Sequence, residues 1–361
     1  MATEEHLRTT QESGKKIKCL VWDLDNTLWQ GVLLEGDTLE LRPGVAELLA
    51  ELDRRGILLS IASRNEVGAA RNELERLGLW EYFLLPQINW SEKSASLAAI
   101  AKGLNLALDS FAFIDDQPYE RAEVQDAHPQ VRCYAPDDLP TLAERPEFNP
   151  EFVTSDSAAR RQMYRLDLQR QDEESVFAGP REDFLRSLDM QFAIHPASRD
   201  DLQRAFELTV RTHQLNTTGR TYSYEELDVF RQSPDHLLLM AELSDRFGPY
   251  GKIGLALVEI KEDCWHIKLL LMSCRVVGRG VGTVLLHRLM EAAFKRGLPV
   301  RADFKGNGRN DMMLTTYRFA KFRTLSCDDS GMKVLEAHPF ALPATPDYVR
   351  LSGGFAGEYY G

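Results

Sequence analysis

The stretch KIKCLVWDLDNTLW, residues 16–29, decides the fold of the first half of the chain. It begins with a short apolar run of the kind that forms buried strands. Two aspartates, Asp23 and Asp25, follow at the end of this run. Parallel α/β sheets bind their ligands at the carboxyl ends of the strands. The stretch therefore predicts a buried parallel strand with an acidic site at its end.

Strand-like runs and helical patterns alternate along the residues that follow. Apolar runs that predict further strands lie at residues 56–63, 81–87, 110–115 and 131–135. Apolar residues at helical spacing occupy residues 45–55, 66–78 and 94–105. Alternation with short connections predicts a parallel sheet wrapped by helices. We therefore expect an α/β domain of Rossmannoid type over residues 16–147, after a polar, disordered tail at residues 1–15.

The second half of the chain predicts a domain of a different class. A charged helical pattern within residues 148–180 is typical of a solvated linker helix. Residues 181–345 then mix both kinds of element, which predicts an α+β domain, and residues 346–361 are expected to be a tail. Its strands are expected at 190–196, 236–245, 253–263 and 264–274, and its helices at 181–189, 199–215 and 282–297.

Composition excludes several classes of partner and compartment. The chain has 361 residues, which suits two domains, and a net charge of −12, which argues against a nucleic-acid binder. It contains no run of 18 apolar residues, so we expect no membrane span. Five scattered cysteines without a signal peptide indicate reduced thiols and a cytoplasmic location.

The acidic residues at the strand ends predict a magnesium-dependent phosphoryl-transfer site. Asp23 would be the nucleophile and a metal ligand, and Asp25 the general acid and base, with its backbone carbonyl on the metal. Thr27 would orient Asp25. The strand at 110–115 runs into Asp115 and Asp116, and a carboxylate there would complete an oxygen-rich shell. Hard carboxylates around a partly hydrated Mg²⁺ suit phosphoryl chemistry.

Thr27 and three further residues are placed to bind the phosphate. Ser63 and Arg64 end the second predicted strand, and Lys93 stands at a helix start, where it can neutralise charge. The order and spacing of all these residues resemble the haloacid dehalogenase (HAD) superfamily. Only short gaps separate Thr27 from Ser63 and Ser63 from Lys93, so the resemblance implies a HAD-like domain without a cap.

A glycine-rich turn marks the second domain. LLLMSCRVVGRGVG, residues 269–282, predicts a strand, a turn and a helix start. Within it Arg275, Gly278 and Gly280 resemble the R-x-x-G-x-G/A loop of GNAT-type acyltransferases. Exposed N–H groups at such a turn can hold the phosphate of coenzyme A or of a phosphopantetheine arm. A plain glycine-rich turn remains the alternative.

Two other features of this domain carry open alternatives. Cys274, beside Arg275, is either a nucleophilic thiol or a small buried residue. The segment RTHQLNTTGRTYS, residues 211–223, has two interpretations. It binds a polar ligand or a carrier protein, or it is a polar turn whose groups hydrogen-bond to one another. The side chains concerned are those of His213, Asn216, Thr217 and Thr218.

Taken together, both halves of the chain resemble the FkbH-like family over about residues 15–345. The resemblance rests on residues 21–37, 113–121, 160–165, 212–223 and 269–282. It implies a capless HAD-type phosphatase domain fused to a GNAT-like domain. Such proteins take a glyceryl unit from D-1,3-bisphosphoglycerate, remove its phosphate and load it on the phosphopantetheine thiol of an acyl carrier protein. Their products feed polyketide and related natural-product pathways.

One departure from the family affects the expected chemistry. Some members have a cysteine between the two aspartates, where this chain has Leu24. An enzyme-bound thioester would therefore need another cysteine, and Cys274 is the best placed. The alternative function is a HAD-type phosphatase of a small phosphorylated metabolite or carrier-bound substrate, with the GNAT-like domain as a docking platform. An acetyl-CoA-dependent acyltransferase with a decayed HAD domain is disfavoured, because the HAD motif residues are intact.

Overall fold

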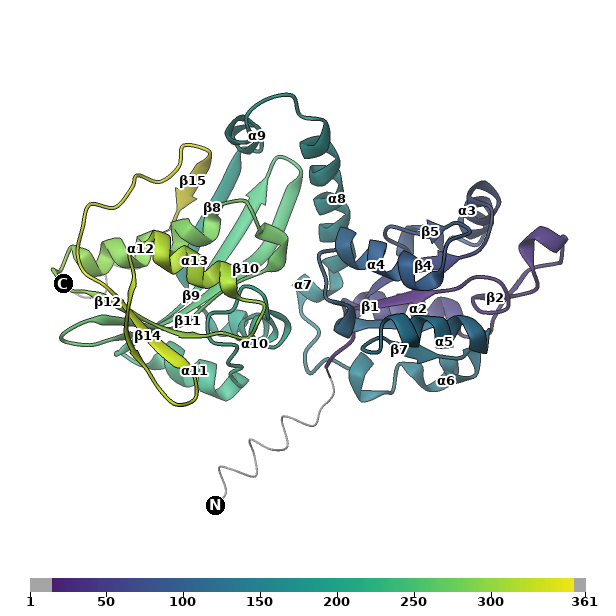
Figure 1. Ribbon diagram of the computed structural model, residues 1–361, viewed down its shortest axis with the longest axis horizontal. Helices are drawn as coiled ribbons and strands as arrows, with labels where there is room; N and C mark the ends of the chain where they lie inside the picture. The colour runs from purple at the N-terminus through teal and green to yellow at the C-terminus, as the bar shows by residue number, and fades with distance from the viewer. Residues whose placement is uncertain (1–14, 354–361) are drawn as a thin grey trace, which may run out of the picture. The chain divides into compact units, whose positions relative to one another are not determined.

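The computed structural model describes residues 15–353, and the chain divides into two compact units at Gln169 and Arg170 (Figure 1). The division falls within helix α8, Arg160–Val176, which follows the short helix α7, Ser155–Ala158. A helix is therefore present within residues 148–180, but it is not fully solvated, because side chains such as Tyr164 and Arg170 are buried. The tail predicted at residues 1–15 lies outside the described residues except for Lys15.

The N-terminal unit contains a five-stranded sheet in the order β5-β4-β1-β6-β7, and all four pairings are parallel. Its strands are β5 (Gln87–Ile88), β4 (Leu58–Ser63), β1 (Cys19–Trp22), β6 (Phe111–Ile114) and β7 (Arg132–Tyr134). Trp22 lies in register beside Ile61 and Ile114. The residues that follow β1, β4 and β6 therefore emerge at one edge of the sheet, as the sequence predicts.

Helices cover both faces of this sheet (Figure 1). Helices α2 (Val45–Arg54), α3 (Val67–Arg76) and α6 (Leu139–Leu142) bury apolar residues on one face. Helices α4 (Lys93–Gly103) and α5 (Pro118–Ala127) bury apolar residues on the other face of the sheet, together with Tyr164 of α8. Burial of apolar surface at about 25 cal/mol per Å² makes these two layers the main source of the unit's stability.

Within the described residues, no cap domain interrupts this unit. Between Thr27 and Ser63 lie only a two-stranded flap, β2 (Trp29–Gln30) with β3 (Glu40–Leu41), a 3-10 turn and helix α2. Between Ser63 and Lys93 lie helix α3, a 3-10 turn at Trp80–Tyr82 and β5. The strand predicted at 81–87 is thus mostly turn, because only Gln87–Ile88 forms a strand paired with β4.

The C-terminal unit contains an eight-stranded mixed sheet in the order β13-β14-β12-β11-β10-β9-β8-β15. The pairs β11–β12 and β8–β15 are parallel, and the others are antiparallel. The strands are β8 (Met190–Pro196), β9 (His236–Asp245), β10 (Gly248–Ile260), β11 (Trp265–Met272), β12 (Val300–Lys305), β13 (Arg323–Cys327), β14 (Met332–Ala337) and β15 (Val349–Ser352).

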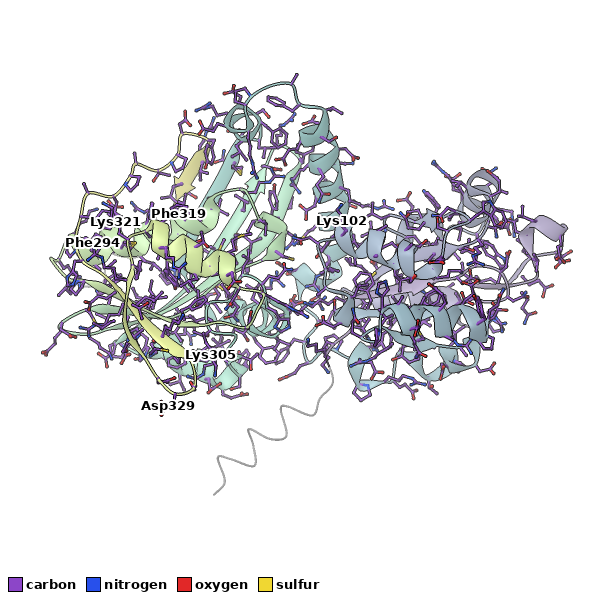
Figure 2. All side chains as sticks on the ribbon, in the orientation of Figure 1. Lys102, Phe294, Lys305, Phe319, Lys321 and Asp329 are labelled. Carbon is purple, nitrogen blue, oxygen red and sulfur yellow. The ribbon has the colours of Figure 1, made fainter. Side chains whose placement is uncertain are left out.

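Helices also cover the two faces of this sheet. Helices α9 (Arg181–Ser187), α12 (Val281–Phe294) and α13 (Asp311–Phe319) contribute to the larger apolar core. Helices α10 (Leu202–Arg211) and α11 (Tyr224–Gln232) pack on the opposite face. Figure 2 labels Phe294 and Phe319 at the ends of α12 and α13.

The C-terminal tail predicted at 346–361 was wrong for residues 349–352. These residues form β15, which pairs with β8 from Val349↔Met190 to Ser352↔Ala193. Such pairing joins residues far apart in sequence, so a local pattern does not reveal it. In the described part of the chain, no helix combines the length and apolar character needed to cross a bilayer.

Candidate functional site

Three carboxylates meet at the carboxyl edge of the N-terminal sheet. Asp23 follows β1, and Asp115 and Asp116 follow its parallel neighbour β6. One oxygen from each lies within 4.8 Å of the others. Asp23 is 7% exposed and Asp115 only 1% exposed, so water screens their mutual repulsion poorly. The sequence prediction that these residues form one site is confirmed as geometry.

Lys93 is the cation of this cluster. It is the first residue of α4 and is 3% exposed. Its Nζ donates to Asp23 Oδ1 at 2.5 Å, to Asp115 Oδ2 at 2.9 Å and to the Ala62 carbonyl at 2.8 Å. Burial disfavours the ammonium, but the charges of Asp23 and Asp115 outweigh it, and the pKa of Lys93 is raised. The cluster thus contains three carboxylates and one cationic side chain.

The remaining negative charge fits a divalent cation. Burial, followed by the charge of Asp23, raises the pKa of Asp115 and also that of Asp116. Crowded carboxylates without a metal should behave in this way. The donors are hard oxygens, which Mg²⁺ prefers over nitrogen and sulfur ligands. The side chains of Asp23, Asp115 and Asp116, with the Asp25 carbonyl, would hold such an ion.

Asp25 is held by three donors that come from the flap and from the loop after β4. The Trp29 indole N–H donates to Asp25 Oδ1 at 2.9 Å, and the Leu33 backbone N–H to the same oxygen at 3.1 Å. The Asn65 amide donates to Asp25 Oδ2 at 2.9 Å. Burial nevertheless raises the pKa of Asp25, which suits a general acid. Sequence reasoning missed Trp29 and Asn65, although both lie within a few residues of a motif aspartate or serine.

Thr27 does not orient Asp25, contrary to the sequence prediction. Its hydroxyl accepts from the Asp116 backbone N–H at 2.9 Å and lies 3.4 Å from Asp116 Oδ1. The chain turns after β1, with the Thr27 N–H donating to the Leu24 carbonyl. Thr27 therefore fixes the loop after β6, and through it the third carboxylate.

The predicted phosphate ligands lie at the same edge. Ser63 is the last residue of β4 and is 3% exposed. The Arg64 side chain is 39% exposed, and its Nη1 lies 3.0 Å from Glu120 Oε1. Glu120 is 4% exposed, and its Oε2 has no hydrogen-bond partner among the described residues. This buried partner of Arg64 was not predicted.

The glycine-rich turn of the C-terminal unit precedes α12. Gly278 and Gly280 have φ of +80° and +78°, which side chains other than glycine adopt at a cost. Arg181 donates to the Gly278 carbonyl at 3.2 Å. A Cβ on Gly280 would lie 2.8 Å from the Tyr348 hydroxyl. Side chains of the same unit, Arg181 and Tyr348, thus lie directly against this turn, and neither was predicted.

Cys274 opens a 3-10 turn, Cys274–Val276, and is half-buried. Helix α12 begins only at Val281, so the thiol does not stand at its N-terminus. The Ser273 hydroxyl accepts from the Arg275 N–H at 3.4 Å. Among the other cysteines, burial raises the pKa of Cys133 to about 12 and raises the pKa of Cys19 and Cys264 as well. These three are poor nucleophiles, and Cys327 is exposed on β13.

The polar loop after α10 binds mainly to its own unit. Asn216 and Thr217 are 0% exposed. Asn216 Oδ1 accepts from the N–H groups of Thr218 and Gly219, at 3.1 and 2.9 Å. The His213 carbonyl accepts from the Asn307 amide at 3.0 Å. These contacts favour the interpretation of a polar turn bonded to its own unit, although Asn216 Nδ2 is buried without a hydrogen-bond partner among the described residues.

A family model described as "Acetyltransferase (GNAT) family" matches residues 201–309. This range contains α10, α11, the central strands β9–β12 and the glycine-rich turn. The C-terminal unit is a GNAT domain. The GNAT-like α+β fold predicted from the glycine-rich turn is confirmed.

Solved structures match each kind of domain. The N-terminal part of the protein BF1531 from Bacteroides fragilis, containing a phosphatase domain and complexed with Mg, is 30% identical over 38% of this chain and 41% of its own, with a TM-score of 0.32. The match thus spans less than half of that chain. The ribosomal-protein-S18-alanine N-acetyltransferase from Escherichia coli is 15% identical over 42% of this chain and 96% of its own, with a TM-score of 0.33.

PaiA N-acetyltransferase from Thermoplasma acidophilum, in complex with coenzyme A, is 17% identical over 41% of this chain and 99% of its own, with a TM-score of 0.31. No curated protein matches the chain. With its parallel sheet covered by helices, the N-terminal unit is a Rossmannoid α/β domain that carries a cluster of three aspartates. The chain thus joins a Rossmannoid domain with an aspartate cluster to a GNAT domain.

Proposed function

We propose that the N-terminal domain is a magnesium-dependent phosphatase of the HAD type. The observation that carries this proposal is the cluster of Asp23, Asp115 and Asp116 with the buried Lys93. A structural ion pair would balance its charges, whereas this cluster keeps an excess of buried negative charge. Such an excess at the carboxyl edge of a parallel sheet is a signature of a functional site.

The residues divide the proposed reaction between them. An Asp23 carboxylate oxygen attacks phosphorus, the bond from phosphorus to the leaving oxygen breaks, and Asp25 gives that oxygen a proton. Water then attacks the aspartyl phosphate, Asp25 takes a proton from it, and phosphate leaves from Asp23. Ser63, Arg64 and Lys93 bind the phosphoryl oxygens. Bound Mg²⁺ would supply positive charge for the phosphoryl group in the transition state.

We propose further that the substrate is a small three-carbon acyl donor, D-1,3-bisphosphoglycerate, and that the glyceryl group passes to an acyl carrier protein. The resemblance to FkbH-like proteins supports this, as does the pairing of a phosphatase-like with a GNAT domain. The phosphate of the phosphopantetheine arm would bind at the turn of Gly278 and Gly280, beside Arg275 and Arg181. Arg181 is a cation already bonded to this turn, which favours an anionic ligand there.

Cys274 is the proposed site of an enzyme-bound thioester. Its thiolate would attack the acyl carbon of the acyl phosphate, and the carbon–oxygen bond to phosphate would break. The carrier thiolate would then attack the thioester carbon and release the Cys274 thiolate. The aspartate site would hydrolyse the remaining phosphate ester. High pKa values at Cys19, Cys133 and Cys264 support Cys274 by leaving few other thiols.

Intact mass spectrometry tests this proposal. The full chain, Mg²⁺, the bisphosphoglycerate and the carrier protein are incubated, and both proteins are weighed. A glyceryl adduct is expected on the carrier, and on the wild-type chain before carrier is added. Cys274→Ala should lose both adducts, whereas Cys327→Ala, the matched control at an exposed thiol, should keep them. Transfer at the wild-type rate in Cys274→Ala would eliminate this thiol as the nucleophile.

A second candidate function is a phosphatase whose GNAT domain only docks a substrate or carrier. The internal hydrogen bonding of Asn216 and Thr217 favours it, because these bonds already occupy polar groups that would otherwise meet a ligand. Phosphate release from small phosphorylated metabolites, with no mass added to any carrier, would support this function over acyl transfer.

A further inference from the structure

Strands β11 and β12 form a gap in the C-terminal sheet. They are parallel and pair at only three positions, Trp265↔Val300, His266↔Arg301 and Ile267↔Ala302. Among the described residues no pairing joins the two strands beyond this point, although they continue to Met272 and Lys305. Diverging strands leave backbone N–H and C=O groups that an extended chain with amide groups can bind. A peptide or a pantetheine arm has this chemistry.

Residues Leu215–Thr217 occupy this gap as a segment outside the named strands that forms one isolated β-bridge. On the β11 side, the Met272 N–H donates to the Leu215 carbonyl at 2.9 Å, and the Thr217 N–H donates to the Leu270 carbonyl at 3.1 Å. An antiparallel bridge joins Asn216 to Leu271. On the β12 side, the N–H of Lys305, labelled in Figure 2, donates to the Thr217 carbonyl at 2.9 Å. The segment thus bonds to both strands.

Side-chain hydrogen bonds hold Leu215–Thr217 in place. Asn310, which is 0% exposed, donates to the carbonyls of Asn216 and Lys305, both at 2.9 Å. The Thr217 hydroxyl accepts from the Leu270 N–H at 3.1 Å, which satisfies a further group of β11. The buried Asn216 side chain fixes the turn that follows. Removing the segment would expose these buried polar groups together.

Beneath the segment, Tyr317 of α13 is sealed from solvent. It is 0% exposed and lies close to the Thr217 side chain, although its hydroxyl has no hydrogen-bond partner among the described residues. Burial raises the pKa of Tyr317. An ionisable group beside Thr217 is therefore closed off together with the segment, which is an observation independent of the backbone bonds.

We infer that Leu215–Thr217 permanently occupies the gap between β11 and β12 and that this gap does not bind a coenzyme A thioester or a pantetheine arm. The GNAT domain of this chain therefore does not transfer acetyl groups through that gap. A carrier arm would have to remain outside it, at the glycine-rich turn. This inference concerns the C-terminal domain alone and stands whether or not the proposed phosphatase function is correct.

Hydrogen exchange on the full chain, combined with titration calorimetry, tests the inference. The amides of Thr217, Met272 and Lys305 are expected to exchange slowly in the protein alone. Millimolar acetyl-CoA, or pantetheine in a parallel experiment, should leave these exchange rates unchanged and produce no binding heat from the gap. Micromolar binding that deprotects Thr217 while protecting Met272 would overturn the inference, because a ligand would then have displaced the segment.

Variants of the side chains that hold Leu215–Thr217 in place test whether this segment causes the slow exchange. Asn310→Ala removes both donors and should accelerate exchange at Thr217 and Lys305 about tenfold, the effect of losing one or two hydrogen bonds. The matched control is Thr316→Ala, which removes a hydroxyl that donates to the Met312 carbonyl within α13 and should leave both rates unchanged.

A second variant serves if Asn310→Ala does not fold. Thr217→Val keeps the side-chain shape and removes the hydroxyl that accepts from the Leu270 N–H, so it should also accelerate exchange in the segment. Unchanged exchange at Thr217 and Lys305 in a folded Asn310→Ala protein would show that Asn310 does not hold the segment in place. Unchanged exchange at residue 217 in Thr217→Val would show the same for the Thr217 hydroxyl.

Discussion

The aspartate cluster of the N-terminal domain and the gap between β11 and β12 both lie where strands end or diverge, yet their polar groups are satisfied to different degrees. Around Asp23, three carboxylates share one lysine, and the pKa values of Asp115 and Asp116 are raised. Around Thr217, backbone and side-chain groups bond to one another on both sides. The first region keeps an excess of buried negative charge. In the second, the buried side-chain atoms left without a partner among the described residues are Asn216 Nδ2 and the Tyr317 hydroxyl.

This difference distinguishes a site that needs a ligand from a region that only resembles a ligand-binding site. Buried like charges are tolerated in a fold when something else compensates them, such as a metal and a phosphate. A gap filled by another segment of the same chain has no such need. Fold similarity alone would predict a ligand in both regions. Hydrogen bonds and charges predict a ligand only at the aspartates.

The largest expected effect tests the charged region. Asp23→Asn removes the nucleophile and should lower phosphatase activity by at least about 10³-fold, as loss of a covalent nucleophile does in other enzymes. The fold should persist, because the change also removes repulsion with Asp115 and Asp116. Phosphate release and circular dichroism measure the two outcomes. Asp126→Asn, an exposed position on α5, is the matched control, and activity retained by Asp23→Asn would refute the assignment.

Mg²⁺ should stabilise the protein through the same cluster. A ligand present at 100 times its Kd that binds only the folded state adds about 2.7 kcal/mol. We therefore expect the Tm of the N-terminal transition to rise with Mg²⁺ and to fall on chelation. Asp115→Asn should reduce the rise, as measured by calorimetry. An equal rise in the wild type and in an Asp23→Asn, Asp115→Asn double variant would place the metal elsewhere.

Asn65→Ala should weaken catalysis while sparing substrate binding. The change removes the donor to Asp25 Oδ2 and leaves the metal carboxylates untouched. We expect kcat to fall about tenfold, the effect of one hydrogen bond to a charged group, with KM nearly unchanged. Asn65→Gln, which retains an amide, should recover part of the rate. Equal changes in kcat and in the binding of Mg²⁺ would indicate a structural role instead.

Gly280→Ala probes the C-terminal domain beside the satisfied region. A residue with a Cβ at φ +78° costs about 1 kcal/mol, and this Cβ would also lie 2.8 Å from the Tyr348 hydroxyl. The free energy of unfolding of the C-terminal domain should fall by about that amount in a chemical denaturation. Tyr348→Phe should recover the part due to the contact. Hydrolysis of small phosphates should not change, and a parallel loss would mean that the two domains unfold together.

The smallest expected effect is a pH dependence without metal. Asp116 has a pKa raised above its usual value, so the folded state favours its protonated form. Its contribution therefore becomes destabilising as the pH rises from about 3.9, the unfolded value, through the raised folded value. Asp116→Asn should stabilise the chelated protein at pH 7 by about 0.5 kcal/mol, because solvent screens this partly exposed group. A loss of stability in chelator, measured by chemical denaturation, would contradict the sign.

Much of the aspartate site is predictable because its residues follow local patterns. Asp23, Ser63 and Asp115 stand at the ends of apolar runs, and parallel strands bring such ends together. The error at Thr27 has a local cause too. Sequence gives its distance from Asp25 but not the direction in which its hydroxyl points after the turn.

The C-terminal domain is less predictable because its decisive contacts are remote in sequence. Leu215–Thr217 bonds to Leu270 and Lys305, and a polar loop gives no local signal that it will bond to two strands of a sheet. The same holds for β15, which pairs with β8 across nearly the whole domain. The glycine-rich turn was found because positive φ leaves a residue signature, whereas Arg181 and Tyr348 reach it from distant segments.

The pairing of β15 with β8 also sets the order in which the nascent chain can fold. Domains generally fold as units, the first to be synthesised before the later ones. The N-terminal sheet is complete in sequence once β7 has left the ribosome, since its last strand ends at Tyr134. The C-terminal sheet must wait for Val349–Ser352 while β8 stands with an open edge. Until these four residues have been synthesised, the unpaired edge of β8 can pair with another chain.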